Sequence, residues 1–277
     1  MTKTLDNFKI VTKAGATYDM AADFNVLVRS FSVSSPRPEF VTDEIDGRHG
    51  KVRMGKTWGS RKLTAVCALF AADSYDVALL RNDVFKALMT LDEFYLICDA
   101  EPGKRWKVEV ANEWTPDRIG RYGEFTVEFV SHGPFAESVG TTLDEKTFDA
   151  EKWQLGQGLI QADDMMYVHT ATSFRIFNAG DETIDPRELP LKITYKGAST
   201  NLVIKNVTTA ETWSYEGTSN SGDNIVLDGI RSTKNGLSIF AKTNRKLISM
   251  KPGWNDFTLE GTSGAFEITF DFRFYYL

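Results

Sequence analysis

Alternation between apolar and polar side chains near the end of the sequence constrains the fold more than any other feature. The apolar positions, two residues apart, are Phe266, Ile268, Phe270, Phe272, Phe274 and Tyr276. The positions between them hold Glu267, Thr269, Asp271, Arg273 and Tyr275. Successive side chains of a β-strand point to opposite faces of a sheet, so this pattern predicts one long strand with one buried face.

Shorter strand patterns recur along the rest of the chain. Residues 106–110 and 125–129 alternate in the same way. From residue 190 onward come the runs LKITY, NLVIKNV, NIVLDGI and GLSIFAK, with turn signals at Lys196-Gly197, Asn235-Gly236 and Pro252-Gly253. Many short strands separated by turns are typical of a β-sandwich or barrel.

One segment has the period of a helix instead. Between residues 73 and 89, apolar side chains recur three or four positions apart, at Val77, Leu80, Val84 and Leu88. Asp73 or Ser74 can cap the start of this helix. We therefore expect a mostly β protein, with one α-helix packed on a β-sandwich-like N-terminal domain and a second β-sandwich at the C-terminus.

The polar segment 136–152 has little periodicity, as expected of a linker or of a strand that enters a second domain. We place the domains at 1–140 and 141–277. Residues 35–50, SPRPEFVTDEIDGRHG, are charged and contain two prolines between two strand-like segments. This composition predicts a long loop or an extended hairpin that projects from the first domain.

Charge and composition exclude several functions. The net charge is −6 with no block of basic residues, which argues against stable nucleic-acid binding. No apolar run approaches the roughly 18 residues that a membrane-spanning helix needs, so membrane insertion is not expected. Cys67 and Cys98 lie in apolar stretches, as reduced core thiols do, and no Cys/His cluster predicts a metal site.

Residues 50–57, GKVRMGKT, match the pattern of a phosphate-binding loop. That chemistry needs a buried strand before the loop and a helix that starts at the lysine. Here the preceding residues are polar and proline-rich, and the alternation of Leu63, Ala65 and Cys67 afterwards indicates a strand. Neither G-x-S-x-G nor H-E-x-x-H occurs either. We therefore expect no catalytic residues, no cofactor and no enzymatic activity.

Three aromatic residues in the second half leave an alternative open. If Trp213, Tyr215 and Trp254 are exposed, they can form a platform on which sugar rings stack. Aromatic residues of this kind also serve as core or rim packing. The first possibility makes the protein a carbohydrate-binding adhesion module.

The order of motifs in the first half resembles the N-terminal domain of the siphophage distal tail protein family. The segments are EIDGRHGKVRMGKTWGSRKL, LLRNDVFKAL, EFYLICDAEPGKRWKVEV and GEFTVEFVSHGPFAES, in that order. In the second half, SFRIFNAGDETIDPRELPLKITYKG and the late PGWN resemble the family as well. Together these segments extend over nearly the whole chain.

The resemblance implies a structural protein at the distal end of the phage tail in the virion. Its members form hexameric rings between the tail tube protein above and the tail-associated fibre or lysin protein below. Their N-terminal domain makes the ring, and an extended hairpin embraces the next subunit. The corresponding arm here runs from Pro36 to Gly59, and its candidate interface residues are Pro36, Pro38, Phe40, Asp46, Gly47, Arg48 and Gly55.

The resemblance further implies a galectin-like C-terminal sandwich that can dock receptor-binding proteins. The segment Trp213-Ser214-Tyr215-Glu216 is similar to part of a galectin sugar site, but no Arg follows two residues after Glu216. The likeness of the sandwich therefore does not carry sugar binding with it.

Overall fold

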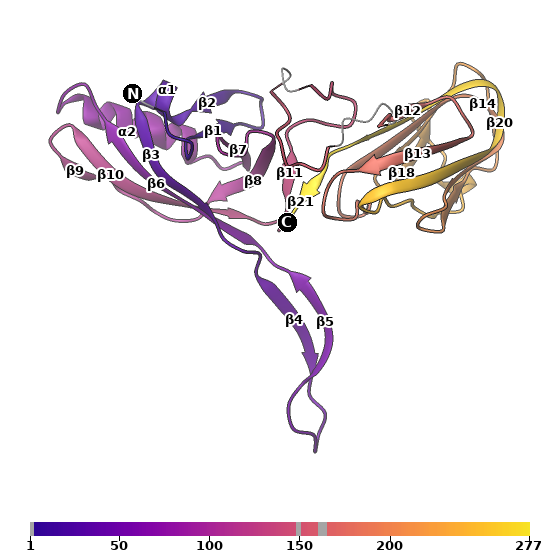
Figure 1. The fold of residues 1–277 in the computed structure, drawn as a ribbon, viewed down its shortest axis with the longest axis horizontal. Coiled ribbons are helices and arrows are strands. Elements are labelled where there is room, and N and C mark those ends of the chain that lie inside the picture. Colours follow the sequence, from indigo (N-terminus) through magenta and orange to yellow (C-terminus); the bar gives the residue numbers. More distant parts are fainter. Residues whose placement is uncertain (1–2, 148–150, 160–164) are drawn as a thin grey trace. The chain divides into compact units, whose positions relative to one another are not determined.

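The computed structural model describes residues 3–147, 151–159 and 165–277. The chain divides into two compact units, one of residues 1–136 with Leu277 and one of residues 137–276. Strands dominate both units, so the predicted mostly β fold is confirmed (Figure 1).

One antiparallel sheet organises the first unit, with its strands in the order β2-β1-β7-β8-β10-β6-β3 and β9 added beside β10. The strands are β1 (Phe8–Val11), β2 (Thr17–Asp19), β3 (Val26–Val33), β6 (Arg61–Phe70), β7 (Phe94–Cys98), β8 (Lys104–Val110), β9 (Asp117–Ile119) and β10 (Tyr122–Ser131). The alternating segments 106–110 and 125–129 lie in β8 and β10, as predicted.

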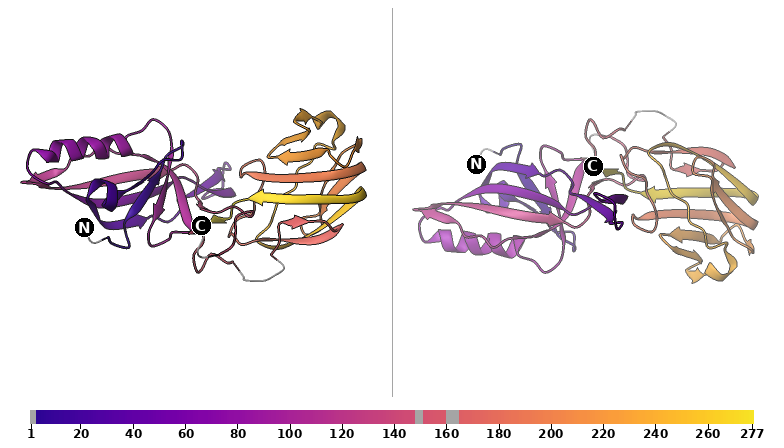
Figure 2. Two further views of the ribbon diagram at one scale, coloured as in Figure 1. Left: turned by 90° about the horizontal axis from the view of Figure 1, so that it is seen from above. Right: turned by 90° about the horizontal axis from the view of Figure 1, so that it is seen from below.

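The predicted helix is α2 (Asp76–Leu88), which lies along one face of these strands (Figure 2). Its buried residues Val77, Val84 and Leu88 belong to the same core as the strands. Asp73 Oδ1 accepts hydrogen bonds from the backbone N–H groups of Tyr75 and Asp76, which satisfies donors of the first turn.

The sequence did not predict a second helix, α1 (Met20–Phe24). Five residues are too few to show a helical period. Asp19 caps its start by accepting hydrogen bonds from the N–H groups of Ala21 and Ala22. Met20 and Phe24 are buried, so packing rather than length stabilises this helix.

Aromatic rings fill the centre of the first unit. The rings of Phe8 and Phe129 meet edge to face with their centroids 5.8 Å apart, and Phe94 approaches Phe129 in the same way. Cys67 and Cys98 are free thiols that are buried, as predicted. Burial raises the pKa of Cys67 to about 12, so this thiol stays protonated and unreactive at neutral pH.

The boundary between the units falls within β11 (Ala136–Ser138), and the second unit is built around two long strands, β14 (Leu191–Asn206) and β20 (Gly253–Phe272). Around them lie β12 (Val168–His169), β13 (Ser173–Asn178), β15 (Glu211–Ser214), β16 (Thr218–Ser219), β17 (Asn224–Asp228), β18 (Arg231–Lys234), β19 (Leu237–Ser238) and a 3₁₀ turn η2 (Phe240–Lys242). The last strand, β21 (Tyr275–Tyr276), pairs with β11 instead.

The long strands take part in both layers of the second unit. The last residues of β14 and the first of β20 pair together beside β13 and β15, whereas their other ends pair beside β12 and β17. The register between β14 and β20 is interrupted after Gly197 and again after Ser199. Bulges of this kind let a strand bend from one sheet of a sandwich to the other.

One predicted turn in this unit was wrong and another was confirmed. Lys196-Gly197 is not a turn but lies within β14, where a side chain on Gly197 would come within 2.6 Å of Phe266 Cβ. The glycine thus marks a close approach of two strands. Asn235-Gly236 is a turn, with positive φ at both residues, between β18 and β19.

The C-terminal alternation predicted the buried face correctly but not the ends of the strand. Ile268, Phe270, Phe272, Phe274 and Tyr276 are buried, whereas Phe266 is only partly buried. The strand starts much earlier, at Gly253, and is interrupted at residues 273–274 before β21. Tyr275 is buried too, which breaks the alternation.

Candidate interaction surface

An exposed two-stranded ribbon is the most distinctive surface of the first unit. It consists of β4 (Pro38–Asp43) and β5 (Val52–Trp58), which form a two-stranded sheet of their own. Hydrogen bonds from Ser34 N to Lys62 O and from Gly59 N to Arg37 O connect it to the paired strands β3 and β6. Figure 1 shows the ribbon leading away from that pair. Of the two possibilities for this segment, loop or extended hairpin, the structure shows the hairpin.

The ribbon buries almost none of its own surface. Every residue of β4 is exposed, and in β5 only Val52 and Gly55 are partly buried. Large apolar side chains are nonetheless concentrated here: Phe40, Val41, Ile45, Met54 and Trp58. Phe40 alone is 57% exposed. A soluble protein rarely leaves such a group of apolar side chains uncovered unless the surface binds something.

The register of the ribbon separates its side chains onto two faces. Pro38 lies opposite Trp58, and Phe40 lies opposite Lys56, so these four share one face. Lys56 Nζ lies 3.9 Å from the centre of the Trp58 ring and 5.9 Å from that of Phe40. The guanidinium of Arg53 lies 5.7 Å from the Phe40 ring. We call the face formed by Phe40, Arg53, Lys56 and Trp58 the aromatic–cationic face.

The opposite face of the ribbon has different chemistry. It carries Glu39 opposite Thr57, Val41 opposite Gly55, and Asp43 opposite Val52. A side chain at Gly55 would lie 3.9 Å from Val41 Cβ. This face is therefore acidic and aliphatic.

The predicted interface residues are distributed along the whole arm. Pro36 lies in the connection before the ribbon, Pro38 and Phe40 lie in β4, and Gly55 lies in β5. Asp46, Gly47 and Arg48 lie at the tip, where Arg48 N donates to Ile45 O. Close to the tip, Lys51 forms an ion pair with Glu44 at 2.9 Å.

Sequence reasoning missed the residues that give the arm its chemistry, namely Arg53, Lys56 and Trp58. A signal for them was present. Strand-forming residues flank an Asp-Gly pair at 46–47, which is typical of a hairpin turn. A two-residue turn there would pair Phe40 with Arg53, whereas the structure closes the ribbon with the longer loop 44–51 and pairs Phe40 with Lys56.

The segment that matches a phosphate-binding loop lies largely within this ribbon. Val52 to Thr57 are part of the exposed strand β5, and β6 follows it. Phosphate binding by such a loop depends on the N-terminus of a helix that starts at the lysine. Lys56 instead lies in a strand and contacts an aromatic ring.

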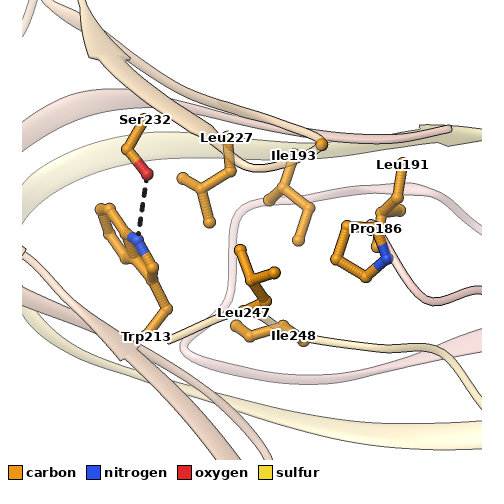
Figure 3. A pocket seen from close by; sticks show the side chains of 9 residues that line it. Pro186, Leu191, Ile193, Trp213, Leu227, Ser232, Leu247 and Ile248 are labelled. Carbon is orange, nitrogen blue, oxygen red and sulfur yellow. Dashed lines mark hydrogen bonds between the residues drawn. The ribbon is translucent and has the colours of Figure 1, made fainter. Parts of the chain in front are cut away.

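The three aromatic residues considered as a sugar platform do not form one. Trp213 is 1% exposed and Tyr215 5% exposed. Figure 3 shows Trp213 beside Ile193, Leu227 and Ile248, with its Nε1 donating to Ser232 Oγ at 3.3 Å. Trp254 packs against Phe177.

In the ranges 3–147, 151–159 and 165–277, no group of three or more His, Cys, Asp or Glu side chains is placed to hold a metal ion. Within the same described ranges, no helix has the length and apolar character needed to cross a membrane. His169 stacks on Phe174 with 4.4 Å between ring centroids and is buried.

Comparisons with known proteins point to phage tails. The family model for the phage tail protein RIFT-related domain matches residues 13–131. No curated protein matches the sequence. The crystal structure of the Dit protein (gp 19.1) of phage SPP1, described as a paradigm of the hub adsorption apparatus in phages that infect Gram-positive bacteria, is similar with a TM-score of 0.69 and 15% identity. The aligned region covers 96% of this chain and 99% of the SPP1 protein.

Two baseplate structures of phage p2 in its activated conformation, with Sr and with Ca, align at TM-scores of 0.48 and 0.47. Each of the two chains is 10% identical to this one. The alignments cover 96% and 95% of this chain, respectively, and 97% of each p2 chain. The SPP1 comparison is the stronger one, and it extends over both units. The resemblance to siphophage distal tail proteins is therefore confirmed: residues 13–131 match the model of the phage tail protein RIFT-related domain, and the chain as a whole shares the fold of the SPP1 Dit protein.

Proposed function

We propose that this protein is a structural, non-enzymatic hub subunit at the distal end of the tail of a long-tailed phage or prophage. Six copies form a ring that links the tail tube to the tail-tip and receptor-binding apparatus. The tail domain at residues 13–131 and the likeness to SPP1 Dit support this role. The observation that carries the ring is the exposed ribbon β4–β5 with its uncovered apolar side chains.

A ring of identical subunits needs two different patches that meet each other around the circle. An arm that extends from one subunit supplies one such patch without using the core of the unit. Pro36 and Pro38 restrict the backbone at the base of the arm, so the arm loses less entropy on docking than a flexible segment would.

The other partners follow from the same role. The first unit contacts the tail tube protein and forms the ring, and the tail-associated fibre or lysin protein lies below it. The second unit docks receptor-binding proteins. A net charge of −6 suits a ring through which DNA passes without binding.

The ring predicts the mass of the protein in solution. Six chains of 31.1 kDa amount to about 187 kDa. We expect light scattering over a concentration series to approach this mass, and negative-stain images to show rings with a central hole. Replacing residues 36–59 by a short Gly-Ser turn should leave a monomer whose circular dichroism is otherwise unchanged.

The wild-type chain at the same concentrations is the control for the deletion. A chain that stays monomeric at high concentration, and also with its neighbouring tail proteins present, would contradict the proposed ring. A deletion variant that still assembles would show that the arm is not what joins the subunits.

A further inference from the structure

The two faces of the ribbon differ in charge, and only one of them offers large rings. The aromatic–cationic face carries Phe40, Trp58, Lys56 and Arg53, whereas the opposite face carries Glu39 and Asp43. Tryptophan, tyrosine and arginine are enriched among the residues that contribute most to binding energy in protein interfaces. The aromatic–cationic face is thus the side of the ribbon better suited to a tight contact.

The first unit also has a groove of complementary chemistry. This groove, of about 350 Å³, lies between the segment of β2 and α1 and the helix α2. Its apolar lining comes from Tyr18, Phe24, Leu80 and Ala87. Phe24 and Ala87 are buried, and Tyr18 packs against Phe24 with 6.0 Å between ring centroids.

Two carboxylates, Asp23 and Asp83, and one cation, Lys86, line the same groove, so its lining carries a net charge of −1. Asp83 pairs with Lys86 at 2.8 Å, but both side chains are more than half exposed, so this pair contributes little to stability. Asp83 can therefore exchange its partner at small cost. The Asp23 carboxylate accepts a hydrogen bond from Asp19 N, which holds it in place at the start of α1.

Apolar lining and acidic groups in one groove match a ridge of aromatic rings and cations. The rings of Phe40 and Trp58 would cover the apolar lining, while Lys56 and Arg53 would meet the carboxylates. The opposite face of the ribbon would bring Glu39 and Asp43 against the same carboxylates, and like charges at an interface disfavour that arrangement. Charge thus selects which face docks.

We propose that the aromatic–cationic face of the ribbon binds the groove between α1 and α2 of a second copy of this chain. The proposal rests on the ring function proposed above and specifies its interface. Each subunit then presents a ribbon to one neighbour and a groove to the other, which is the heterologous contact that a closed ring requires.

A charge-reversal cycle between the two sides tests the pairing. Lys56→Glu and Asp83→Lys should each weaken self-association, measured by sedimentation equilibrium, by about tenfold or more, because each places like charges together at the interface. The chain that carries both substitutions restores opposite charges and should recover most of the wild-type association. Both residues are exposed, so neither substitution should disturb folding.

Glu39→Gln on the opposite face is the matched control, and its association should stay within about twofold of the wild type. If deletion of residues 36–59 abolishes the ring but Lys56→Glu and Asp83→Lys do not weaken it, the proposed interface is wrong and the ring function stands. Weakening by both single changes without recovery in the double variant also overturns the pairing. A wild-type monomer would instead remove the ring function itself.

Discussion

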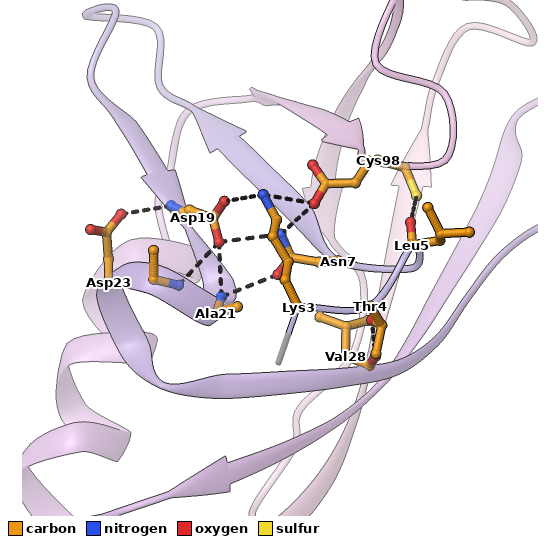
Figure 4. Close-up of polar contacts among 11 residues, drawn as sticks. Lys3, Thr4, Leu5, Asn7, Asp19, Ala21, Asp23, Val28 and Cys98 are labelled. Carbon is orange, nitrogen blue, oxygen red and sulfur yellow. Dashed lines mark hydrogen bonds and ion pairs between the residues drawn. The ribbon is translucent and has the colours of Figure 1, made fainter. Parts of the chain in front are cut away.

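Lys3 is held by two carboxylates at one edge of the first unit (Figure 4). Its Nζ lies 2.8 Å from Asp19 Oδ2 and 2.8 Å from Asp99 Oδ2. Asn7 Nδ2 donates to both of these side chains, and Asn7 Oδ1 accepts from Ala21 N. The cluster ties the first residues of the chain to α1 and to the end of β7.

Burial would raise the pKa of Asp19, but the hydrogen bonds from Lys3, Ala22 and Asn7 outweigh it and lower the pKa below the usual 3.8. Asp19 therefore stabilises the fold above the pKa of the unfolded chain, and this contribution is lost as the pH falls through the lowered value. The hydrogen bonds to Asp19 and Asp99 raise the pKa of Lys3 above 10.5, so its contribution is lost as the pH rises through that raised value.

Removing the lysine charge should therefore flatten the pH dependence. We expect Lys3→Met to lower the free energy of unfolding near neutral pH by about 1 kcal/mol or less, because Lys3 is partly exposed. The loss of stability in acid should also become smaller than in the wild type. Urea unfolding at several pH values between about 2 and 6 measures both effects. Identical profiles for the two proteins would show that Lys3 does not set the pKa of Asp19.

Asn255, in the PGWN segment, explains why that segment ends in a polar residue. It is fully buried, and its amide donates to Lys251 O at 2.7 Å and to Gly253 O at 3.1 Å. Its Oδ1 accepts from Lys251 N and from the amide of Asn206, another fully buried residue. The side chain thus satisfies the backbone of the turn before β20, where an apolar residue would leave buried groups unpaired.

The bend of β14 and β20 depends on one position where only glycine fits. Gly261 has φ +80°, and a Cβ there would lie 2.5 Å from Thr200 O and 2.6 Å from Asn201 O. On β14 the register passes from Ser199 to Val203 while β20 advances only from Thr262 to Glu260. The extra residues bulge against Gly261, and the two strands bend there together.

Gly261→Ala should therefore destabilise the second unit. The added Cβ meets backbone oxygens that cannot move away without breaking the pairing, so we expect a loss of about 2 kcal/mol or more in chemical unfolding. Gly222→Ala is the matched control, because a Cβ there meets nothing within 4 Å and φ is not in the left-handed region. It should change stability by less than about 0.5 kcal/mol. Equal effects of the two substitutions would contradict this account of the bend.

Two compact units with separate cores should unfold as two cooperative steps. We expect calorimetry to resolve two transitions, with Lys3→Met lowering one and Gly261→Ala lowering the other. The transition of the first unit should rise with protein concentration if its arm joins the copies, because association stabilises the folded state. A single transition that both substitutions shift equally would show that the units unfold together.

Much of the architecture follows from local sequence patterns. The period of two marked the buried face of the C-terminal strand, and the spacing of Val77, Val84 and Leu88 marked α2. Prolines and charges between strand-like segments indicated the projecting arm. These features depend on neighbouring residues, since the geometry of one strand or helix decides which side chains share a face.

Other features arise only when distant segments meet. LKITY and NLVIKNV form one strand because Gly197 lies against Phe266, almost seventy positions later. Trp213 and Tyr215 are buried because other strands cover them, which their own sequence does not reveal. The groove joins Phe24 to Leu80, and the aromatic–cationic face exists because the hairpin register sets Lys56 opposite Phe40. Local periodicity determines the element and its faces, whereas long-range pairing and packing decide which face is covered and which chemistry is left exposed.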